Sequence, residues 1–502
     1  MCIITMNFMS KCGKSFKFFE RNSARFRLYC TKSSDKDGPP VQKFEHPLSR
    51  TLRILKADLK TIKNYIPFIH KQHYGNKFFS DHCDIVVIGG GVIGSSIAYW
   101  LQTRVRDGVR VIVIEKDPSY AKASTPLSCG GIRQQFSLPE NIQMSMFGAE
   151  FLRNIKRYLH VEGDNPPDVC FTPYGYLFLA TDRSAQQLEE NVHLQHQLGV
   201  KNELLSPAML KKKFPWLDTT GIALGCHGLE NEGWFDPWSL LMAFKKKAIS
   251  AGAEYVTAEA IGFEFRKMPD MLIEGVEPGT YETIDRVLVK TENGEVRPIK
   301  FGIAVIAAGA NSKKVAEMAR IGKGSGYLSV PLPIEPRKRY VYCVHCPEGP
   351  GLNTPFVIDP TGTYFRREGF GGNFICGKSP TEEEGEPSIE DLEVDSSYFD
   401  NSVWPHLAAR VPAFEQLKVK NAWAGYYDTN VVDENGIVGP HPYYHNLYLA
   451  AGFSGHGIQQ APAVGRAVME MMFEGGFKTI DLSRFGFDRL MYNELLREVN
   501  IV

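Results

Sequence analysis

Six residues near position 90 have the types and spacing needed to hold a dinucleotide. Gly89-Gly90-Gly91-Val92-Ile93-Gly94 fits the pattern G-x-G-x-x-G. In such a turn the first glycine permits the bend, the second lets the backbone approach a pyrophosphate, and the third lets a helix pack against a strand. Glu115 follows about 20 residues later, where a carboxylate accepts hydrogen bonds from a ribose. These residues predict a dinucleotide site that either NAD or FAD would fit.

The elements that must position this turn can be read from the flanking residues. Residues 83–88 (CDIVVI) and 109–115 (VRVIVIE) predict buried strands, and residues 95–105 (SSIAYWLQTRV) predict the helix between them. A transmembrane helix is the alternative for this apolar stretch. Glycine is unfavourable in a helix by about 1 kcal/mol per residue, and the run is shorter than the ~20 residues that a bilayer requires. We therefore expect a Rossmann-like unit and no transmembrane span.

Composition limits the remaining possibilities. The chain has 502 residues, which suggests two or three domains of about 150 residues each. Its formal net charge is zero, so no global attraction to nucleic acid is expected. The ten cysteines are scattered and do not predict a disulfide framework. Cys343 and Cys346 form a C-x-x-C pair within RYVYCVHC, which alternates like a strand, so we expect no metal site there.

The N-terminal 34 residues differ from the rest of the chain. They contain seven Lys or Arg residues and one acidic residue, Glu20, with serines and aromatics between them. This composition is typical of a mitochondrial transit peptide, and a disordered basic tail is the alternative. Residues 35–80 then predict a linker followed by an amphipathic helix at 47–66, with leucines at helical spacing. That helix would pack on this chain or dock on a partner or a membrane surface.

The rest of the chain predicts two interleaved domains. Segments with the character of a nucleotide fold begin near Cys83, Asp236 and Leu447, and Asp236-Pro237 has the chemistry of a helix start. Residues 331–377 are rich in aromatic and β-branched residues, in short alternating runs that favour an antiparallel sheet. The predicted fold class is therefore α/β, a Rossmann-like dinucleotide-binding domain interleaved with an α+β domain built on an antiparallel sheet.

Longer strings resemble a known family. DIVVIGGGVIGSSIAYWL, VIVIEKD, AVIAAGANS and AGFSGHGIQQAPAVGRAV are similar to the D-amino-acid-oxidase-like flavoproteins, which include sarcosine and dimethylglycine dehydrogenases and glycine oxidase. ASTPLSCGGIRQQFSLPEN, YFRREG, VWPHLAARVPAFE and AWAGYYDTN, with the basic leader, resemble a mitochondrial branch of that family associated with assembly of respiratory complex I. The resemblance implies FAD as the cofactor. It also implies a mitochondrial matrix location, contact with complex I intermediates or subunits, and peripheral contact with the inner membrane.

The resemblance implies domain limits and a binding site. The FAD-binding domain would comprise residues 82–166, 226–318 and 421–475, the substrate-like domain 167–225 and 319–420, and a C-terminal tail 476–502. The residues implied to bind FAD are Gly89, Gly91, Val92, Ile93, Gly94, Glu115, Lys116, Ser124, Thr125, Gly131, Ile132, Ile261, Ala308, Gly309, Gly452, Phe453, Ser454, Gly455, His456, Gly457 and Ile458. The turn at 452–457 would present backbone N–H groups to the edge of the flavin, where a reduced flavin is negative.

Four positions depart from the sarcosine-oxidase pattern. The members with covalent flavin have a cysteine at the position of Ala424 or a histidine at the position of Leu127, so the resemblance implies non-covalent FAD here. The oxidases also have a lysine near the position of Ile375 and another at that of Gln459. An apolar or neutral residue supplies no fixed positive charge for superoxide or for a carboxylate. We therefore expect a dehydrogenase or a weakly active protein rather than an efficient oxidase.

Candidate catalytic residues come from the same resemblance. They are Arg133, Arg366, Tyr364, Tyr426 and His456, with Tyr427 as a further candidate for the wall of the site. Arg133 and Arg366 would contact a substrate carboxylate, although Arg366 could equally be a surface strand residue. His456 could equally fix the glycine turn, and core packing is the alternative role of each tyrosine.

Three functions are compatible with these observations. The first is an FAD-dependent dehydrogenase that transfers hydride from a small amine or amino acid, such as an N-methyl or secondary amino acid, to the flavin. The second is an assembly factor for complex I (NADH dehydrogenase) that retains FAD and acts through protein contacts. The missing lysines and the predicted helix at 47–66 favour this second function over the first, and both can be true of one protein. The third is an NAD(P) enzyme, which the second glycine turn and the interleaved domains disfavour.

Overall fold

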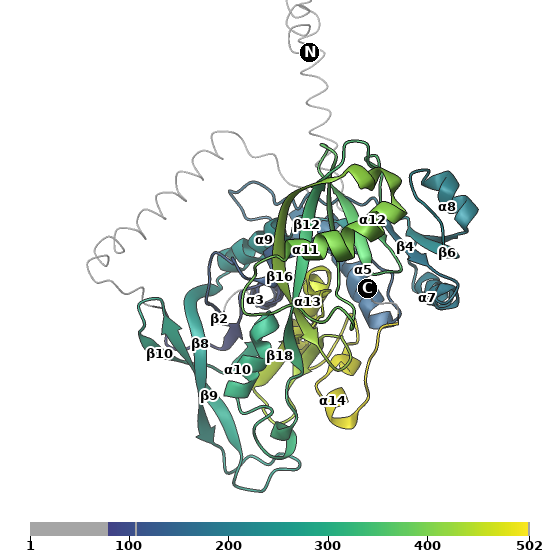
Figure 1. Ribbon diagram of the computed structural model, residues 1–502. Helices are drawn as coiled ribbons and strands as arrows, with labels where there is room; N and C mark the ends of the chain where they lie inside the picture. The colour runs from purple at the N-terminus through teal and green to yellow at the C-terminus, as the bar shows by residue number, and fades with distance from the viewer. Residues whose placement is uncertain (1–78, 106–107, 500–502) are drawn as a thin grey trace, which may run out of the picture. The chain divides into compact units, whose positions relative to one another are not determined.

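The computed structural model describes residues 79–105 and 108–499 (Figure 1). The predicted transit peptide and the predicted helix at 47–66 lie outside these residues and stay predictions. Within the described part, β1 (Ile85–Ile88), α3 (Val92–Arg104) and β2 (Val111–Glu115) form the predicted strand, helix and strand. β1 and β2 pair in parallel, with Ile85 opposite Val111, and all four residues of β1 are buried. The apolar segments on either side of the glycine turn therefore predicted these elements correctly.

An eight-stranded sheet is built around this unit. Its strand order is β10-β9-β8-β2-β1-β11-β18-β17, and β8, β2, β1, β11 and β18 run in parallel. The strands added to the unit are β8 (Glu254–Lys267), β9 (Glu282–Thr291), β10 (Val296–Lys300), β11 (Ile303–Ile306), β17 (Ile437–Pro440) and β18 (Leu447–Ala451). One face packs against α3, α5 (Pro139–Arg153), α9 (Pro237–Ser250) and α13 (Gly457–Glu474) in a continuous apolar core. The other face is covered in part by α10 (Ser312–Met318).

The second sheet also has eight strands, in the order β16-β12-β15-β14-β13-β4-β6-β5. These are β4 (Tyr176–Ala180), β5 (Asn202–Leu205), β6 (Leu224–Gly228), β12 (Ile334–His345), β13 (Phe356–Ile358), β14 (Thr363–Glu368), β15 (Asn373–Lys378) and β16 (Lys418–Asn430). Every pairing in this sheet is antiparallel except that of β13 with β4. The chain enters this sheet twice, between visits to the first, which confirms the predicted interleaved α/β class.

Smaller elements connect the two sheets. A two-stranded sheet is formed by β3 (Gly131–Ile132), which follows α4 (Ser124–Leu127) in the chain, and β7 (Gly233–Trp234), which precedes α9. The second sheet is flanked by α7 (Ala185–Gln197), α8 (Pro207–Lys213) and α12 (Trp404–Arg410). The domain limits stay predictions; of these, position 421 falls within β16, which pairs with β12. None of the helices in the described part is long and apolar enough to cross a membrane.

Asp236 caps α9 as the sequence predicted. Its carboxylate accepts from the backbone N–H groups of Trp238 and Ser239, both at 3.2 Å, and Pro237 is the first residue of the helix. Cys343 and Cys346 fall on β12 and just after it, as strand residues would. Among the residues that the structure describes, no cluster of His, Cys, Asp or Glu has the arrangement of a metal site.

Candidate functional site

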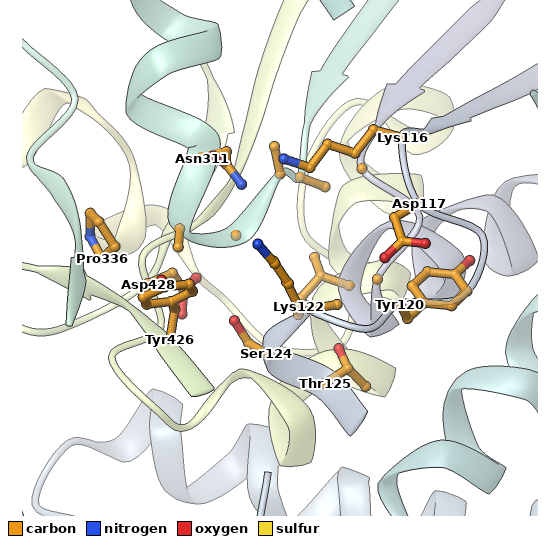
Figure 2. Close-up of a pocket in the computed structure, with 18 of the residues that line it drawn as sticks. Lys116, Asp117, Tyr120, Lys122, Ser124, Thr125, Asn311, Pro336, Tyr426 and Asp428 are labelled. Atoms are coloured by element: carbon orange, nitrogen blue, oxygen red, sulfur yellow. The ribbon is translucent and has the colours of Figure 1, made fainter. Parts of the chain in front are cut away.

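A cavity of about 730 Å³ begins at the glycine turn after β1 and extends to the second sheet (Figure 2). Seventeen of the predicted residues line it: Gly89, Gly91, Val92, Ile93, Glu115, Lys116, Ser124, Thr125, Ala308, Gly309, Phe453, Gly455, Gly457, Ile458, Tyr364, Tyr426 and Tyr427. Nine others do not reach its lining: Gly94, Gly131, Ile132, Arg133, Ile261, Arg366, Gly452, Ser454 and His456. Both glycine turns therefore open into one cavity, although they are more than 350 residues apart in sequence.

The first turn brings the backbone to the edge of the cavity. Gly89 has φ +106°, a conformation that favours glycine. A Cβ on Gly94 would lie 1.9 Å from the carbonyl oxygen of Gly89, so α3 packs on the turn only because Gly94 has no side chain. The backbone N–H of Val92 donates to Thr125 Oγ1 at 3.2 Å. The bend at Gly89 and the close packing of α3 at Gly94 are thus as the spacing predicted, and the approach of the backbone to a pyrophosphate stays a prediction.

Glu115 is fixed beside the turn by backbone donors. Its Oε2 accepts from Gly90 N at 2.9 Å and its Oε1 accepts from Asp117 N at 2.9 Å. The carboxylate lines the cavity at the end of β2, where a ribose could donate to it. Figure 2 shows Lys116 and Lys122 directed into the same space from the segment that follows β2. An anionic dinucleotide would therefore meet positive side chains at this end.

Ile261 does not contact the cavity, contrary to the role that the resemblance implied for it. Its side chain is 38% exposed on β8. The β8 residues that line the cavity are Ala258, Glu259 and Ala260. The contact therefore falls a few residues earlier than the resemblance implied, and Ile261 itself lies at an irregularity in the pairing of β8 with β9.

The second glycine turn presents the start of α13 to the cavity. No side chain caps this helix and its first turn holds no acidic residue, while Gly457 and Ile458 line the cavity. Asp428, which the sequence analysis did not select, accepts from Gly452 N at 2.9 Å and from Phe453 N at 3.2 Å. Burial raises the pKa of Asp428 to about 6. The uncapped N–H groups and positive end of α13 can therefore stabilise negative charge on a ligand.

Arg133 and His456 lie behind this turn and contact one another. Arg133 NH2 lies 3.0 Å from His456 Nε2, and Arg133 N donates to Gln459 Oε1 at 2.8 Å. Burial, and then the positive charge of Arg133, lower the pKa of His456 to about 3. His456 is therefore neutral and accepts a hydrogen bond from the guanidinium, which favours the alternative in which it fixes the turn.

The Arg133 guanidinium has an unusual environment for a buried cation. It lies 4.8 Å from the centroid of the Phe136 ring and 4.9 Å from that of Phe178, and its Nε has no hydrogen-bond partner. No carboxylate forms an ion pair with it among the described residues. Buried charges are normally paired, so this cation beside α13 lacks the partner that its burial would ordinarily require.

Arg366 supports the wall of the cavity from outside. Its Nε donates to the carbonyl oxygen of Cys129 at 2.9 Å, and NH1 donates to Arg367 O and to the carboxylate of Glu368. Cys129 lines the cavity, whereas Arg366 does not. In the structure its donors are therefore used to hold the segment that carries Cys129, and not to contact a ligand.

The second sheet contributes an aromatic wall and an arginine. Tyr364 and Tyr427 line the cavity, and burial raises both of their pKa values, that of Tyr427 to about 12. Tyr426 also lines it, but its hydroxyl donates to the carbonyl oxygens of Ile389 and Asp391. Arg339 lies 5.7 Å from the Tyr427 ring, pairs with Glu386 at 2.6 Å, and has a buried Nε without a partner. Arg339 was missed because RKRY on a strand resembles a solvated face.

The four departures from the oxidase pattern have visible consequences. Ala424 is buried on β16 and Leu127 lines the cavity, and neither side chain can form a covalent bond to a flavin. Ile375 is buried on β15, between β12 and β14. Gln459 accepts the hydrogen bond from Arg133 N. Neither Ile375 nor Gln459 supplies a fixed charge, as expected from the sequence.

The residues present fit a flavin dinucleotide. The volume lies within the roughly 300–1,000 Å³ typical of small-molecule sites. An acceptor for a ribose lies at one end, an open glycine turn faces the middle, and an uncapped helix start lies at the other end. The fold and the cavity thus define the class of flavoproteins in which two domains are interleaved.

Comparison with known proteins agrees with this class. The family described as FAD dependent oxidoreductase matches residues 84–471. The chain is 53% identical over 427 residues to FAD-dependent oxidoreductase domain-containing protein 1 of Xenopus laevis, covering 84% of this chain and 85% of that one. It is 44% identical over 500 residues to the Drosophila melanogaster homolog, covering 94% and 95%. The solved structure of L-proline dehydrogenase from P. horikoshii superposes with a TM-score of 0.68 at 29% identity, covering 83% of this chain and 100% of that one.

The chain therefore belongs to the FAD dependent oxidoreductase family, and its cofactor is non-covalently bound FAD.

Proposed function

We propose that the protein is an FAD-dependent dehydrogenase of a small amine, with a secondary or N-methyl amino acid as its substrate class. The observation that carries the proposal is the single cavity that joins the FAD turn to the wall of Tyr364, Tyr427 and Arg339. The solved relative named L-proline dehydrogenase, which acts on a secondary amino acid by its name, supports the substrate class.

The bound flavin would supply the chemistry by accepting hydride from the carbon next to the amine. The side chains of this protein would orient the substrate and exclude water. Tyr364 and Tyr427 are half-buried, and burial raises the pKa of both, so they provide a neutral aromatic wall with hydroxyl groups. The uncapped start of α13 would stabilise negative charge at the acceptor. Arg339, whose Nε has no hydrogen-bond partner, is the cation that the second sheet contributes to the lining and could attract a carboxylate.

The proposal can be tested on purified protein that retains FAD. N-methyl and secondary amino acids are added one at a time without oxygen, while the flavin absorption spectrum is recorded. We expect at least one compound to bleach the flavin, and Arg339→Met to weaken its apparent affinity at least tenfold. Lys313→Met, on the surface outside the cavity lining, is the control and should behave as wild type. A flavin that no compound in the panel bleaches would contradict the dehydrogenase proposal.

A second proposed function is support of complex I assembly in the mitochondrial matrix, with the protein acting through contacts with complex I intermediates. The observation that favours a role other than rapid oxidation is the lack of a fixed charge at Ile375 and Gln459. The two functions can coexist.

Complementation of cells that lack the protein separates the two proposed functions. Complex I levels are compared after expression of wild type, of Arg339→Met, and of a chain without residues 47–66. Assembly restored to the wild-type level by Arg339→Met would show that tight substrate binding is dispensable for it. Unchanged association of the deleted chain with complex I intermediates would remove the docking role predicted for that segment.

A further inference from the structure

The last described residues of the chain, up to Val499, lie against the start of α5 (Figure 1). Glu498 accepts from Ser137 N at 2.6 Å, from the Ser137 hydroxyl, from Leu138 N at 3.2 Å and from Asn141 Nδ2 at 2.6 Å. Leu138 occupies the N-cap position of α5, and no side chain of the helix itself caps it. The carboxylate that satisfies these donors thus comes from 360 residues further along the chain.

This segment is packed and hydrogen-bonded at several points. Leu496 is 5% exposed within the core of the first sheet. Leu496 N donates to Asp433 Oδ2 at 3.1 Å, and Asn435 Nδ2 donates to Leu496 O at 3.0 Å. Val499 N donates to the Ser137 hydroxyl oxygen at 2.8 Å. Glu498 is therefore held at α5 from both sides.

The hydrogen bonds continue from Glu498 to the start of α13. Asn141, which donates to Glu498, also accepts from Gln460 Nε2 at 2.9 Å. The neighbouring residue Gln459 accepts from Arg133 N. A Cβ on Gly148 of α5 would lie 2.3 Å from the carbonyl oxygen of Gln459, so the two helices are in close backbone contact at this level. A shift of α5 would therefore move the first turn of α13, which lines the flavin cavity.

Glu498 also acts on Arg133 through its charge. Burial lowers the pKa of Arg133, and Tyr176, Glu498 and Glu232 oppose this effect. Glu232 is itself buried, and burial raises its pKa to about 7, so it carries only part of a negative charge near neutral pH. No carboxylate in the part of the chain that the structure describes contacts the guanidinium directly. Glu498 binds Ser137, four residues after Arg133, so its charge partly offsets that of this buried cation, which in turn contacts His456 and Gln459 at the second glycine turn.

We propose that Glu498 is a positioning residue of the flavin site, which caps α5, ties it to the first turn of α13, and balances the charge of Arg133. The proposal rests on FAD binding and does not depend on which amine is oxidised. It predicts that Glu498 affects the reduction potential of the bound flavin, in addition to stabilising the fold.

Three variants of the FAD-bound protein separate these roles. Glu498→Gln removes the charge; Ser137→Ala weakens the cap but keeps the charge; Glu494→Gln removes an exposed charge from the same segment. The measurements are the two-electron reduction potential of the bound flavin and the thermal unfolding midpoint. Loss of the Glu498 charge leaves the site more positive, which favours the reduced and more negative flavin.

We expect Glu498→Gln to shift the reduction equilibrium about tenfold toward reduced flavin, which is about 30 mV for a two-electron couple. Ser137→Ala should lower the unfolding midpoint without moving the potential, and Glu494→Gln should change neither. An unchanged potential in Glu498→Gln, or an equal shift in Glu494→Gln, would overturn the proposal. If Glu498→Gln fails to retain FAD, Glu498→Asp is measured in its place. FAD binding by Glu498→Asp would support the role of the charge, whereas loss of FAD from Glu498→Asp as well would refute it.

Discussion

Replacing Gly91 with alanine should separate FAD binding from folding. Gly91 has φ −63° and ψ −173°, which alanine adopts without strain. A Cβ at this position would meet only Thr125 Oγ1, at an ordinary contact distance of 3.5 Å. The methyl group would therefore cause no clash within the protein. It would instead project into the cavity, where the backbone must approach the pyrophosphate.

The size of each effect follows from this geometry. Replacing glycine by alanine in a permitted conformation stabilises a protein by about 0.4–1 kcal/mol, because the unfolded chain loses freedom. The apoprotein should thus be as stable as wild type or slightly more stable. Hydrogen bonds to a charged group contribute about 1.5–3 kcal/mol, so loss of one pyrophosphate contact weakens FAD binding by roughly 10- to 150-fold. Quenching of flavin fluorescence on titration of apoprotein measures the dissociation constant.

Two matched glycines serve as controls. Gly262→Ala on β8 meets only Leu288 Cδ1 at 3.7 Å, so it should stabilise the fold as slightly as Gly91→Ala does and leave the FAD affinity unchanged. Gly94→Ala places a Cβ 1.9 Å from Gly89 O and should lose both, since overpacking of this kind typically costs about 1–3 kcal/mol. If Gly91→Ala binds FAD with the wild-type dissociation constant, the reasoning about the turn is refuted.

Three further predictions concern buried charge and are tested on the apoprotein by chemical denaturation. The folded-state pKa of His456 is lowered to about 3 from 6.5, so between these pH values the unfolded chain binds a proton that the folded chain does not. The free energy of unfolding therefore falls as pH falls from 6.5 to 3, and His456→Asn should remove up to about 5 kcal/mol of this loss. An unchanged acid sensitivity in His456→Asn would contradict the prediction. The pKa of Asp428 is raised to about 6 from 3.8, so its contribution is lost as pH rises through that window, and Asp428→Asn should gain up to about 3 kcal/mol at pH 7 relative to pH 4. Asp433→Asn leaves the buried Arg489 without its countercharge and should lower the free energy of unfolding by about 3–5 kcal/mol. The control Glu474→Gln, in an exposed pair with Arg104, should change it by less than about 0.5 kcal/mol. Equal effects of the two variants would refute the argument from burial.

The parts of the site that the sequence predicted are those governed by local rules. The turn at Gly89, the helix after it and the acid at Glu115 are contiguous, and each has a residue type that its backbone or ligand demands. The second turn was found through the resemblance, because SGHG before a helix carries no phosphate signature of its own. In both cases the residues that define the feature are neighbours in sequence, so their spacing is informative.

The missed features depend on contacts between distant residues. Asp428 lies near the end of β16 and accepts a hydrogen bond from the backbone N–H of Gly452 in the second glycine turn. The two residues are far apart in sequence, so no local pattern links the carboxylate to the turn. Arg339 enters the cavity because β12 lies beside the edge strand β16, a pairing that a single sequence does not reveal. Glu498 caps a helix that begins 360 residues earlier. Side-chain direction and long-range pairing decide all three, and neither has a local pattern.

The distribution of charge around Arg133 connects these observations. An oxidase-like site would hold lysines at the positions of Ile375 and Gln459, and this chain has none there. The positive charge that remains beside α13 is Arg133, whose guanidinium faces two aromatic rings and a neutral histidine. In a low-dielectric setting such a charge acts strongly and over a longer range than at the surface. A carboxylate that offsets the charge of Arg133, as we propose for Glu498, therefore changes the reduction potential of the bound flavin without contacting it.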